Sequence, residues 1–456
     1  MTAATGTATG MTTGRQDAAR EATAALGAWV AGLRWDDVPA DARDRTTLVL
    51  LDSLGVMALG ARQPEQRALV EAWRPAPGPA PLVGGGRSTT VEAAAWLNAS
   101  ALVRLELDEG HKYAKGHPGA HALPAVLALA ADLGSTGADT AAALVAAYAV
   151  AARFGRATSL VAGAHPHGSW GVAGAAAGCA RLLGLPADAV AAAIDTGAGL
   201  PVAGHFDSAL DGNPVRDAWM SASNVSGLAA ARMAAAGLAR NTGTAASSLG
   251  GLLGAFDPDR LVDGLGERWD IRHGYFKRHA SCSFTHPVAD AVLALRPGLS
   301  ADVDEVLVET HALGAGLDRT TWDSRLGALF SIPFVVATAL VHGHVGPSAS
   351  AEAARDDARV RSLAARVRVA AAADLDARLP DERAARVTVR SAGRDHVLEV
   401  PNPVGDAAHH PFAEAEVLAL LTGWLADDET VGVVREVATG LPAAPDVGPL
   451  LRRLAR

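Results

Sequence analysis

Residues 141–152 read AAALVAAYAVAA, an apolar run of 12 residues that stops at Arg153. Alanine is the residue that most favours a helix, and the run is shorter than the roughly 18 residues that a membrane-spanning helix needs. It lies inside a longer alanine-rich stretch, residues 122–238, which is interrupted by short segments containing glycine and proline. Such segments separate helices. The stretch therefore predicts a series of closely packed, buried helices, and we expect a mainly α protein.

The hydrophobic pattern changes after about residue 274. Residues 304–310, DEVLVET, alternate between polar and apolar side chains, with Val306 and Val308 on one face. This period of two predicts a strand. Three more strands and two helices are expected at residues 366–370, 385–389, 396–400, 336–341 and 351–365.

These patterns divide the 456 residues into two domains, as the length also suggests, because one hydrophobic core seldom serves so long a chain. We expect a large all-helical domain at residues 17–274, completed by a C-terminal segment at residues 409–456. The smaller unit, residues 275–408, is expected to be an α+β lid domain. Residues 1–16 are rich in threonine, alanine and glycine and predict a disordered tail rather than a signal peptide.

Charge and cysteine content restrict the function. The net charge of −9 lacks the concentrated basic surface that nucleic-acid binding requires. The two cysteines, Cys179 and Cys282, are too few for an iron–sulfur cluster or a cysteine-rich zinc site, and they favour a reducing compartment. With no apolar run long enough for a membrane helix, we expect a cytoplasmic protein that binds neither nucleic acid nor membrane.

The segment from Leu105 to Pro124, LELDEGHKYAKGHPGAHALP, gathers acidic, basic and imidazole groups between apolar helices. A plain surface connector can carry charge, but three histidines favour a functional loop. Imidazole exchanges a proton near neutral pH, and a nearby carboxylate stabilises its charged form. Catalytic groups often lie on loops held by rigid helices. We select Glu106, Asp108, His111 and His117 as catalytic candidates and Lys112 as a substrate-binding candidate.

A second segment, residues 165–171, reads HPHGSWG. Proline and glycine fix its backbone, so His165 and His167 are expected to be held in place. The alternative is a helix-entry turn capped by Ser169. We expect His165 to be catalytic and His167 to contact the substrate.

Two cations later in the chain are candidates for binding an anion. Arg216 can form a bidentate clamp on a carboxylate, but the sequence alone favours a simple surface pair with Asp217. Lys277 lies where the helical part gives way to the α+β part, and sites often form at such junctions. Nearby, His286 and Pro287 are more typical of a helix start than of catalysis.

Histidine pairs raise the question of a metal site. None of the pairs stands in an H-E-x-x-H pattern or beside suitable cysteines, so we expect no metal. The glycines of residues 84–86 are followed by neither a Walker lysine nor a G-x-G-x-x-G pattern, so we do not expect a phosphate loop. The pairs are His165 and His167, His342 and His344, and His409 and His410.

Taken in order, these segments resemble the MmgE/PrpD family, which includes 2-methylcitrate dehydratase, cis-aconitate decarboxylase and iminodisuccinate epimerase. The resemblance covers nearly the whole chain after its first residues. It rests on Val38-Pro39-Ala40 with Leu50 to Gly55, on Leu105 to Glu109, on His117-Pro118-Gly119 with Pro124, on His165-Pro166 with Gly168, Gly171 and residues 175–185, on Phe276-Lys277 with Cys282, His286-Pro287 and Asp290, and on Phe330 to Phe334.

The resemblance implies a helical domain with a smaller lid, a site between them, a homodimer and no cofactor. It places the two acidic positions of the family on Glu106 and Asp108 and the two catalytic histidines on His117 and His165. A family lysine falls on Arg216 and a later one on Lys277. Three positions depart from the family pattern: Glu106 replaces Asp, Gly110 replaces a common Thr, and Arg216 replaces Lys, while His111 is an addition.

These residues predict a cofactor-independent lyase for a small anionic carboxylic acid. Arg216, Lys277 and Lys112 would hold carboxylates and stabilise the enolate-like charge that forms when a proton leaves the neighbouring carbon. His117 or His165 would move that proton, with Asp108 or the other histidine as the acid. Dehydration of a hydroxy di- or tricarboxylic acid is our first expectation. Decarboxylation, epimerisation, a non-catalytic carboxylate-binding protein and a metal hydrolase are the alternatives.

Overall fold

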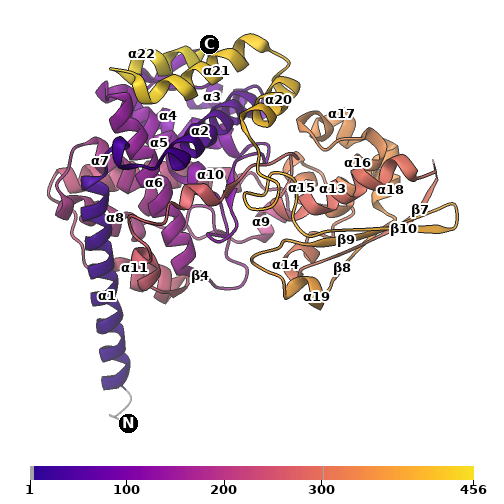
Figure 1. Cartoon of the computed structure of the whole chain (residues 1–456), viewed down its shortest axis with the longest axis horizontal. Coiled ribbons are helices and arrows are strands. Elements are labelled where there is room, and N and C mark those ends of the chain that lie inside the picture. The colour runs from indigo at the N-terminus through magenta and orange to yellow at the C-terminus, as the bar shows by residue number, and fades with distance from the viewer. Residues whose placement is uncertain (1–4, 301) are drawn as a thin grey trace.

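The computed structural model describes residues 5–300 and 302–456. Helices from the first half of the chain form a large body, and a four-stranded sheet with its own helices lies to one side of it (Figure 1). The prediction of a mainly α fold with a smaller α+β part is confirmed. In these two ranges, no helix is long and apolar enough to cross a bilayer.

The alanine-rich run forms the middle of α6 (Gly137–Ala157), in which every residue from Thr140 onward is buried. Neighbouring helices approach closely because glycine and alanine leave room: a Cβ added at Gly174 would lie 2.6 Å from the carbonyl oxygen of Ala147. The surrounding helices are α2 (Ala40–Ala61), α3 (Pro64–Trp73), α4 (Val91–Val103), α5 (Pro118–Leu133), α7 (Val172–Leu182), α8 (Ala187–Ala198) and α10 (Val215–Ala235), with short helices α9 (Asp207–Leu210), α11 (Thr244–Ser247) and α12 (Asp259–Val262).

Helix α1 (Thr5–Gly32) begins inside the stretch for which the composition predicts a disordered tail. That prediction therefore does not hold for residues 5–16, and residues 1–4 lie outside the described residues. Leu26 and Val30 of α1 are fully buried in the main core and fix the helix. Extending an established helix is far easier than nucleating one, which explains how the weak helix formers before them continue it.

The C-terminal segment packs against the helical part. Helices α20 (Glu414–Leu425) and α21 (Asp428–Gly440) pack against α2, and α22 (Val447–Arg452) packs against α5; all three are yellow in Figure 1. Leu421 of α20 occupies the space that Gly55 of α2 leaves, since a Cβ there would lie 2.4 Å from a methyl carbon of Leu421. The same hydrophobic core contains both segments.

The smaller part has a core of its own around a mixed sheet of order β10-β9-β7-β8. The strands are β7 (Val303–Thr310), β8 (Val367–Ala371), β9 (Ala385–Ser391) and β10 (Arg394–Val400), and β9 and β10 form an antiparallel hairpin as expected. Val306 and Val308 of β7 are fully buried. The helices of this part are α13 (His286–Leu295), α14 (Ala312–Ala315), α15 (Arg325–Leu329), α16 (Ile332–His342), α17 (Glu352–Arg355), α18 (Ala358–Ala364) and α19 (Ala373–Asp376).

Three two-stranded ribbons complete the fold. They are β1 (Pro77–Leu82) with β2 (Arg87–Thr89), β4 (Thr158–Leu160) with β5 (Gly254–Phe256), and β3 (Gly110–His111) with β6 (Gly274–Tyr275). The last of these matters for function, because it joins the loop after α4 to the segment that leads into the smaller part.

Candidate active site

The β3–β6 pairing brings two distant segments together. Gly110 pairs with Tyr275 and His111 with Gly274, so the acidic residues just before β3 lie beside Lys277, which follows β6. The backbone of Glu106 takes the left-handed conformation, with φ of 53°, which is uncommon for a residue with a side chain. This bend directs the loop into the helical part, where Glu106 and Asp108 are buried.

Two carboxylates and two cations meet in this interior. Lys277 Nζ lies 3.5 Å from Glu106 Oε2 and 3.5 Å from Asp108 Oδ1, and Arg216 forms an ion pair with Glu106. Arg216 also lies 3.2 Å from Asp217 Oδ1 and donates to the carbonyl oxygen of Val103 at 2.9 Å. Arg216 is thus a buried part of the cluster as well as a partner of Asp217, and the surface-pair alternative is wrong.

His117 is held by two acceptors on its Nδ1 side. Nδ1 lies 3.0 Å from Asp108 Oδ2 and 2.7 Å from the carbonyl oxygen of Glu109. Both are acceptors, so Nδ1 carries the proton, and Nε2 of the neutral ring is left as an acceptor. Burial by itself would raise the pKa of Asp108, but the charges of His117 and Lys277 outweigh it and hold that pKa below its usual value. Asp108 therefore stays ionised beside the ring of His117.

Glu109, whose carbonyl oxygen accepts from His117, is itself held in place by its carboxylate. Its carboxylate accepts from the backbone N–H of Gly119 at 2.6 Å and from the hydroxyl of Tyr148 at 3.0 Å. Burial raises the pKa of Glu109 to about 7. Gly119 is required for the close approach, since a Cβ there would lie 2.6 Å from Glu109 Oε1. Tyr148 is a residue that sequence reasoning missed, although a hydroxyl within the run AAALVAAYAVAA was a signal for a buried polar contact.

His165 has the opposite hydrogen-bonding state. Its Nδ1 accepts from the backbone N–H of His167 at 3.1 Å, so the proton of the neutral ring is on Nε2. Burial, reinforced by the charge of Arg216, lowers the pKa of His165 well below its ordinary value, and the ring stays neutral. It stacks on Phe206 at 5.1 Å between ring centroids. Ser169 closes the turn that carries His165 and His167. Both histidines also belong to the cluster of acidic residues and cations.

The ring of His167 lies between the two other histidines. Its centroid is 5.1 Å from that of His117 and 4.4 Å from that of His165. The structure thus brings His117, His165 and His167 together with the acidic residues and cations. Each residue of this cluster is less than one-tenth exposed: Glu106, Asp108, His117, His165, His167, Arg216 and Lys277.

Two candidates from the same loop lie elsewhere. His111 accepts from the backbone N–H of Ala114 at 3.1 Å, and its ring faces Asp270 and Tyr148. Lys112 donates to Asp406 Oδ2 at 3.1 Å and to the carbonyl oxygen of Asp381 at 2.9 Å. The chain reverses between His111 and Gly116, so side chains next to each other in the sequence point to different places. His111 and Lys112 therefore make structural contacts that lie outside the histidine cluster.

Three side chains of the cluster carry atoms that could together bind a metal ion. Asp108, His117 and His167 each offer one ligand atom, all within 4.8 Å of one another. Nδ1 of His117 already donates to the carbonyl oxygen of Glu109 and lies 3.0 Å from Asp108, and Lys277 lies 3.5 Å from the same carboxylate. A divalent cation here would have to overcome repulsion from Lys277 and Arg216. The residues fit an acid–base group better than a metal site.

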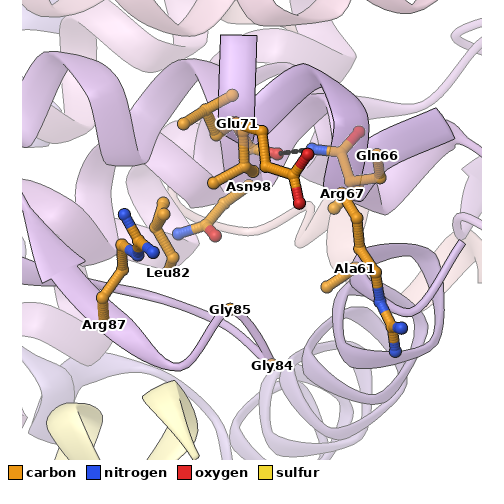
Figure 2. A pocket seen from close by; sticks show the side chains of 12 residues that line it. Ala61, Gln66, Arg67, Glu71, Leu82, Gly84, Gly85, Arg87 and Asn98 are labelled. Atoms are coloured by element: carbon orange, nitrogen blue, oxygen red, sulfur yellow. Dashed lines mark hydrogen bonds between the residues drawn. The ribbon is translucent and has the colours of Figure 1, made fainter. Parts of the chain in front are cut away.

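A surface pocket lies apart from this cluster and contains the glycine loop (Figure 2). Arg67, Glu71 and Arg87 line it together with Gly84 and Gly85. The backbone N–H groups of Gly84 and Gly86 donate to the carbonyl oxygens of Leu454 and Ala455. Because the C-terminal end of the chain uses these donors, the loop does not present them to a phosphate, in agreement with the sequence.

Two family models match this chain, and so do individual proteins over most of its length. The family model described as the MmgE/PrpD N-terminal domain matches residues 24–259, and the one described as the MmgE/PrpD C-terminal domain matches residues 279–421. A cis-aconitate decarboxylase of Aspergillus terreus is 26% identical over 93% of this chain and 94% of its own length. A cis-aconitate decarboxylase-like protein, oryM, of Aspergillus oryzae is 29% identical over 60% of this chain and 61% of its own length. With the two family models together matching most of its length, the chain belongs to the MmgE/PrpD family.

Proposed function

We propose that this protein is a cofactor-independent lyase that transfers a proton at a carbon next to a carboxylate, in a small di- or tricarboxylic acid. One observation carries the proposal: His117 and His165 have complementary hydrogen-bonding states beside a buried pair of cations. His117 Nε2 is an acceptor backed by Asp108, and His165 Nε2 is a donor. A base and a hydrogen-bond donor in one cluster are what removal of a proton and departure of a neighbouring group require.

Our first candidate reaction is dehydration. Arg216 and Lys277 bind the carboxylate whose α-proton is removed and stabilise the enolate that forms. His117 Nε2 takes that proton, the C–H electron pair becomes the new C=C bond, and the C–O bond to the hydroxyl breaks. His165 donates a hydrogen bond to the leaving oxygen but keeps its proton, because burial holds it neutral. The proton on His117 then passes to the departing hydroxide, so water leaves and His117 returns to its starting state.

Decarboxylation is the second candidate, and the relative that matches nearly the whole chain favours it, since that protein of Aspergillus terreus is named cis-aconitate decarboxylase. Here the C–C bond to a carboxylate breaks, CO₂ leaves, and the electron pair remains on carbon. The imidazolium form of His117, stabilised by Asp108, then protonates that carbon. Epimerisation would use the same groups to remove a proton and return it to the other face.

The two candidates differ in the form of His117 that begins the reaction and in the substrate. Dehydration begins with the neutral ring, whereas decarboxylation needs the imidazolium to protonate carbon. Citrate and cis-aconitate are suitable first substrates, because one carries a hydroxyl to lose and the other does not.

The test of the function is incubation with citrate, cis-aconitate and related hydroxy acids in heavy water, followed by NMR. We expect deuterium to enter the carbon skeleton with wild-type protein, also in the presence of a chelator. Exchange should be lost in His117→Ala and strongly reduced in His165→Ala. The matched control is His344→Ala, which changes a histidine of the smaller part. Wild-type protein that exchanges nothing but still binds carboxylates would support the non-catalytic alternative, and loss of exchange on chelation would support a metal hydrolase.

The cytoplasmic location and the homodimer belong to the same proposal. The net charge of −9 and the two buried, free cysteines are consistent with a reducing compartment. Sedimentation analysis of the purified chain measures the oligomeric state directly. A monomer at micromolar concentration would contradict the homodimer and leave the proposed chemistry unaffected.

A further inference from the structure

A lid arginine next to the cluster carries a buried charge that lacks a carboxylate partner. Arg383 lies between α19 and β9 and is 8% exposed. Its backbone N–H donates to Asn402 Oδ1 at 3.4 Å, and its Nη1 donates to Ser283 Oγ at 3.2 Å. Across residues 5–300 and 302–456, no aspartate or glutamate forms an ion pair with Arg383, whereas Arg386, three residues later, pairs with Glu399 and Asp374.

Aromatic rings hold this guanidinium in place. Its Cζ lies 5.0 Å from the ring centroid of Tyr275 and 5.7 Å from that of Phe284. Rings contact the flat faces of a guanidinium and leave the N–H groups at its edge free for an acceptor. Apart from Ser283 Oγ, the described residues offer no hydrogen-bond acceptor to these side-chain N–H groups.

Both neighbours of Arg383 connect it to the catalytic cluster. Tyr275 is two residues before Lys277, and Ser283 directly follows Cys282. Tyr275 also pairs with Gly110, which is two residues after Asp108 in the sequence. Arg383 therefore lies at the edge of the cluster, on the side of the smaller domain.

Gly110 makes this position of Tyr275 possible. A Cβ at residue 110 would lie 2.4 Å from Tyr275 Oη and 2.4 Å from Tyr275 Cζ. Any other residue at 110 would move the ring on which Arg383 lies. The glycine in the catalytic loop thus sets the position of a lid residue.

We propose that Arg383 binds a further carboxylate of the substrate, one that Arg216 and Lys277 do not hold, with the hydroxyl of Tyr275 as a second donor. The inference rests on the proposed function and narrows its substrate class to acids with at least two carboxylates, of which a tricarboxylate makes most use of the site. A buried arginine keeps its charge at all physiological pH values, and an unpaired buried charge is unfavourable. A ligand carboxylate supplies the missing partner with bidentate geometry.

The experiment measures how affinity depends on the number of carboxylates. Tricarballylate, glutarate and butyrate carry three, two and one, and none of them has a hydroxyl to eliminate. Calorimetric titration of wild-type protein should give the tightest binding with tricarballylate. Arg383→Gln should weaken tricarballylate binding by roughly 10- to 100-fold, the loss expected for one charged hydrogen-bonded contact, and change butyrate binding by less than about threefold.

Matched variants separate recognition from a structural role. Arg390→Gln removes a lid arginine that pairs with Asp395 on the surface and should leave all three affinities unchanged. If Arg383→Gln does not fold, Arg383→Lys keeps the charge but loses the planar fork. It should reduce the preference for tricarballylate over butyrate by roughly 3- to 10-fold. Tyr275→Phe keeps the ring and should reduce the preference by a smaller factor.

The outcomes are distinct. An equal loss for all three acids in the Arg383 variants, or an unchanged preference, overturns the proposal, as does wild-type protein that binds tricarballylate no better than butyrate. If deuterium exchange occurs and the preference does not depend on Arg383, this inference fails and the proposed function stands. If the preference depends on Arg383 but no acid exchanges deuterium, the lyase is wrong and carboxylate recognition remains.

Discussion

Asp108→Asn tests the central pair of the proposed mechanism with little change in shape. Asn has the size of Asp, and the carbonyl oxygen of Glu109 still accepts from His117 Nδ1 at 2.7 Å. The orientation and tautomer of the His117 ring are therefore expected to survive. What the substitution removes is the negative charge 3.0 Å from the ring, together with a partner of Lys277.

The size of the effect follows from this geometry. Opposite unit charges about 3 Å apart attract by roughly 5 kcal/mol at an effective dielectric constant of about 20. Part of this is regained because Lys277 keeps Glu106 and the neutral amide is easier to bury than a charge. A net loss of roughly 3–5 kcal/mol in the stabilisation of the imidazolium corresponds to exchange that is about 10²- to 10⁴-fold slower.

Deuterium entry into citrate or cis-aconitate, followed by NMR at fixed protein concentration, measures this rate. Asp270→Asn is the control, because Asp270 is an equally buried carboxylate with arginine partners, Arg153 and Arg156, away from the histidine cluster. It should lower the free energy of unfolding and leave exchange per folded molecule within about threefold of wild type. Exchange by Asp108→Asn at near the wild-type rate would refute the role of this pair.

Two further predictions concern loop residues outside the cluster. Burial lowers the pKa of His111 from 6.5 to about 3, so the unfolded chain binds a proton that the folded chain does not, and stability is lost as pH falls below about 6.5. His111→Asn retains an acceptor for the N–H of Ala114, and its deuterium exchange should be retained. Between pH 6.5 and pH 5, the free energy of unfolding in urea should fall by about 2 kcal/mol less in this variant than in wild type. An equal fall in the two proteins would contradict this prediction. Lys112→Met leaves Asp406 buried without its partner and should lower the free energy of unfolding by about 3–5 kcal/mol. The substrate KM should stay within about threefold of wild type. A large rise in KM at unchanged stability would instead show that Lys112 is a substrate ligand.

Sequence patterns predict the helical body well because its helices are long and their signals repeat. The run at residues 141–152 predicts buried α6, and Val91–Val103 forms one helix, α4, directly before the loop that carries Glu106 and Asp108. The β9–β10 hairpin follows from alternation and a turn in the same way. The start of helix α1 is harder to predict from the sequence. Its later residues pack in the core, and this packing extends the helix into a stretch of weak helix formers.

The site depends on short contacts that leave almost no pattern in the sequence. The β3–β6 ribbon has two residues on each strand, too few for any periodicity, yet it places Lys277 beside Asp108. The reversal after His111 is also local, so composition predicts a histidine-rich loop but not which histidine faces the cluster. Tyr148 and Arg383 lie in segments with no motif, and only the three-dimensional arrangement shows what they contact.

The balance of charge in the cluster leads to a last prediction, that ligand binding takes up a proton. With a neutral His117 ring, three cations, of which Arg104 is only partly buried, face three buried carboxylates, so the charges of these six groups balance. A polycarboxylate adds at least two negative charges to a nearly closed site, and an unbalanced buried charge costs several kcal/mol. Protonation of His117, next to Asp108, supplies one positive charge. The six balanced groups are Arg104, Arg216, Lys277, Glu106, Asp108 and Asp217.

Calorimetry of tricarballylate binding at pH 8 in buffers of different ionisation enthalpy measures this uptake. We expect uptake of about one proton per site in wild-type protein, because proton linkage requires a group whose protonation differs between the free and bound states. The two groups able to take up this proton are His117 and Glu109, whose pKa burial raises to about 7. Uptake that is lost in His117→Gln and kept in Glu109→Gln would mean an imidazolium in the complex, as decarboxylation requires. If Glu109→Gln abolished the proton uptake and His117→Gln kept it, Glu109 would be the group that takes up the proton. His117 would then be neutral in the complex, which the first step of dehydration requires and decarboxylation does not.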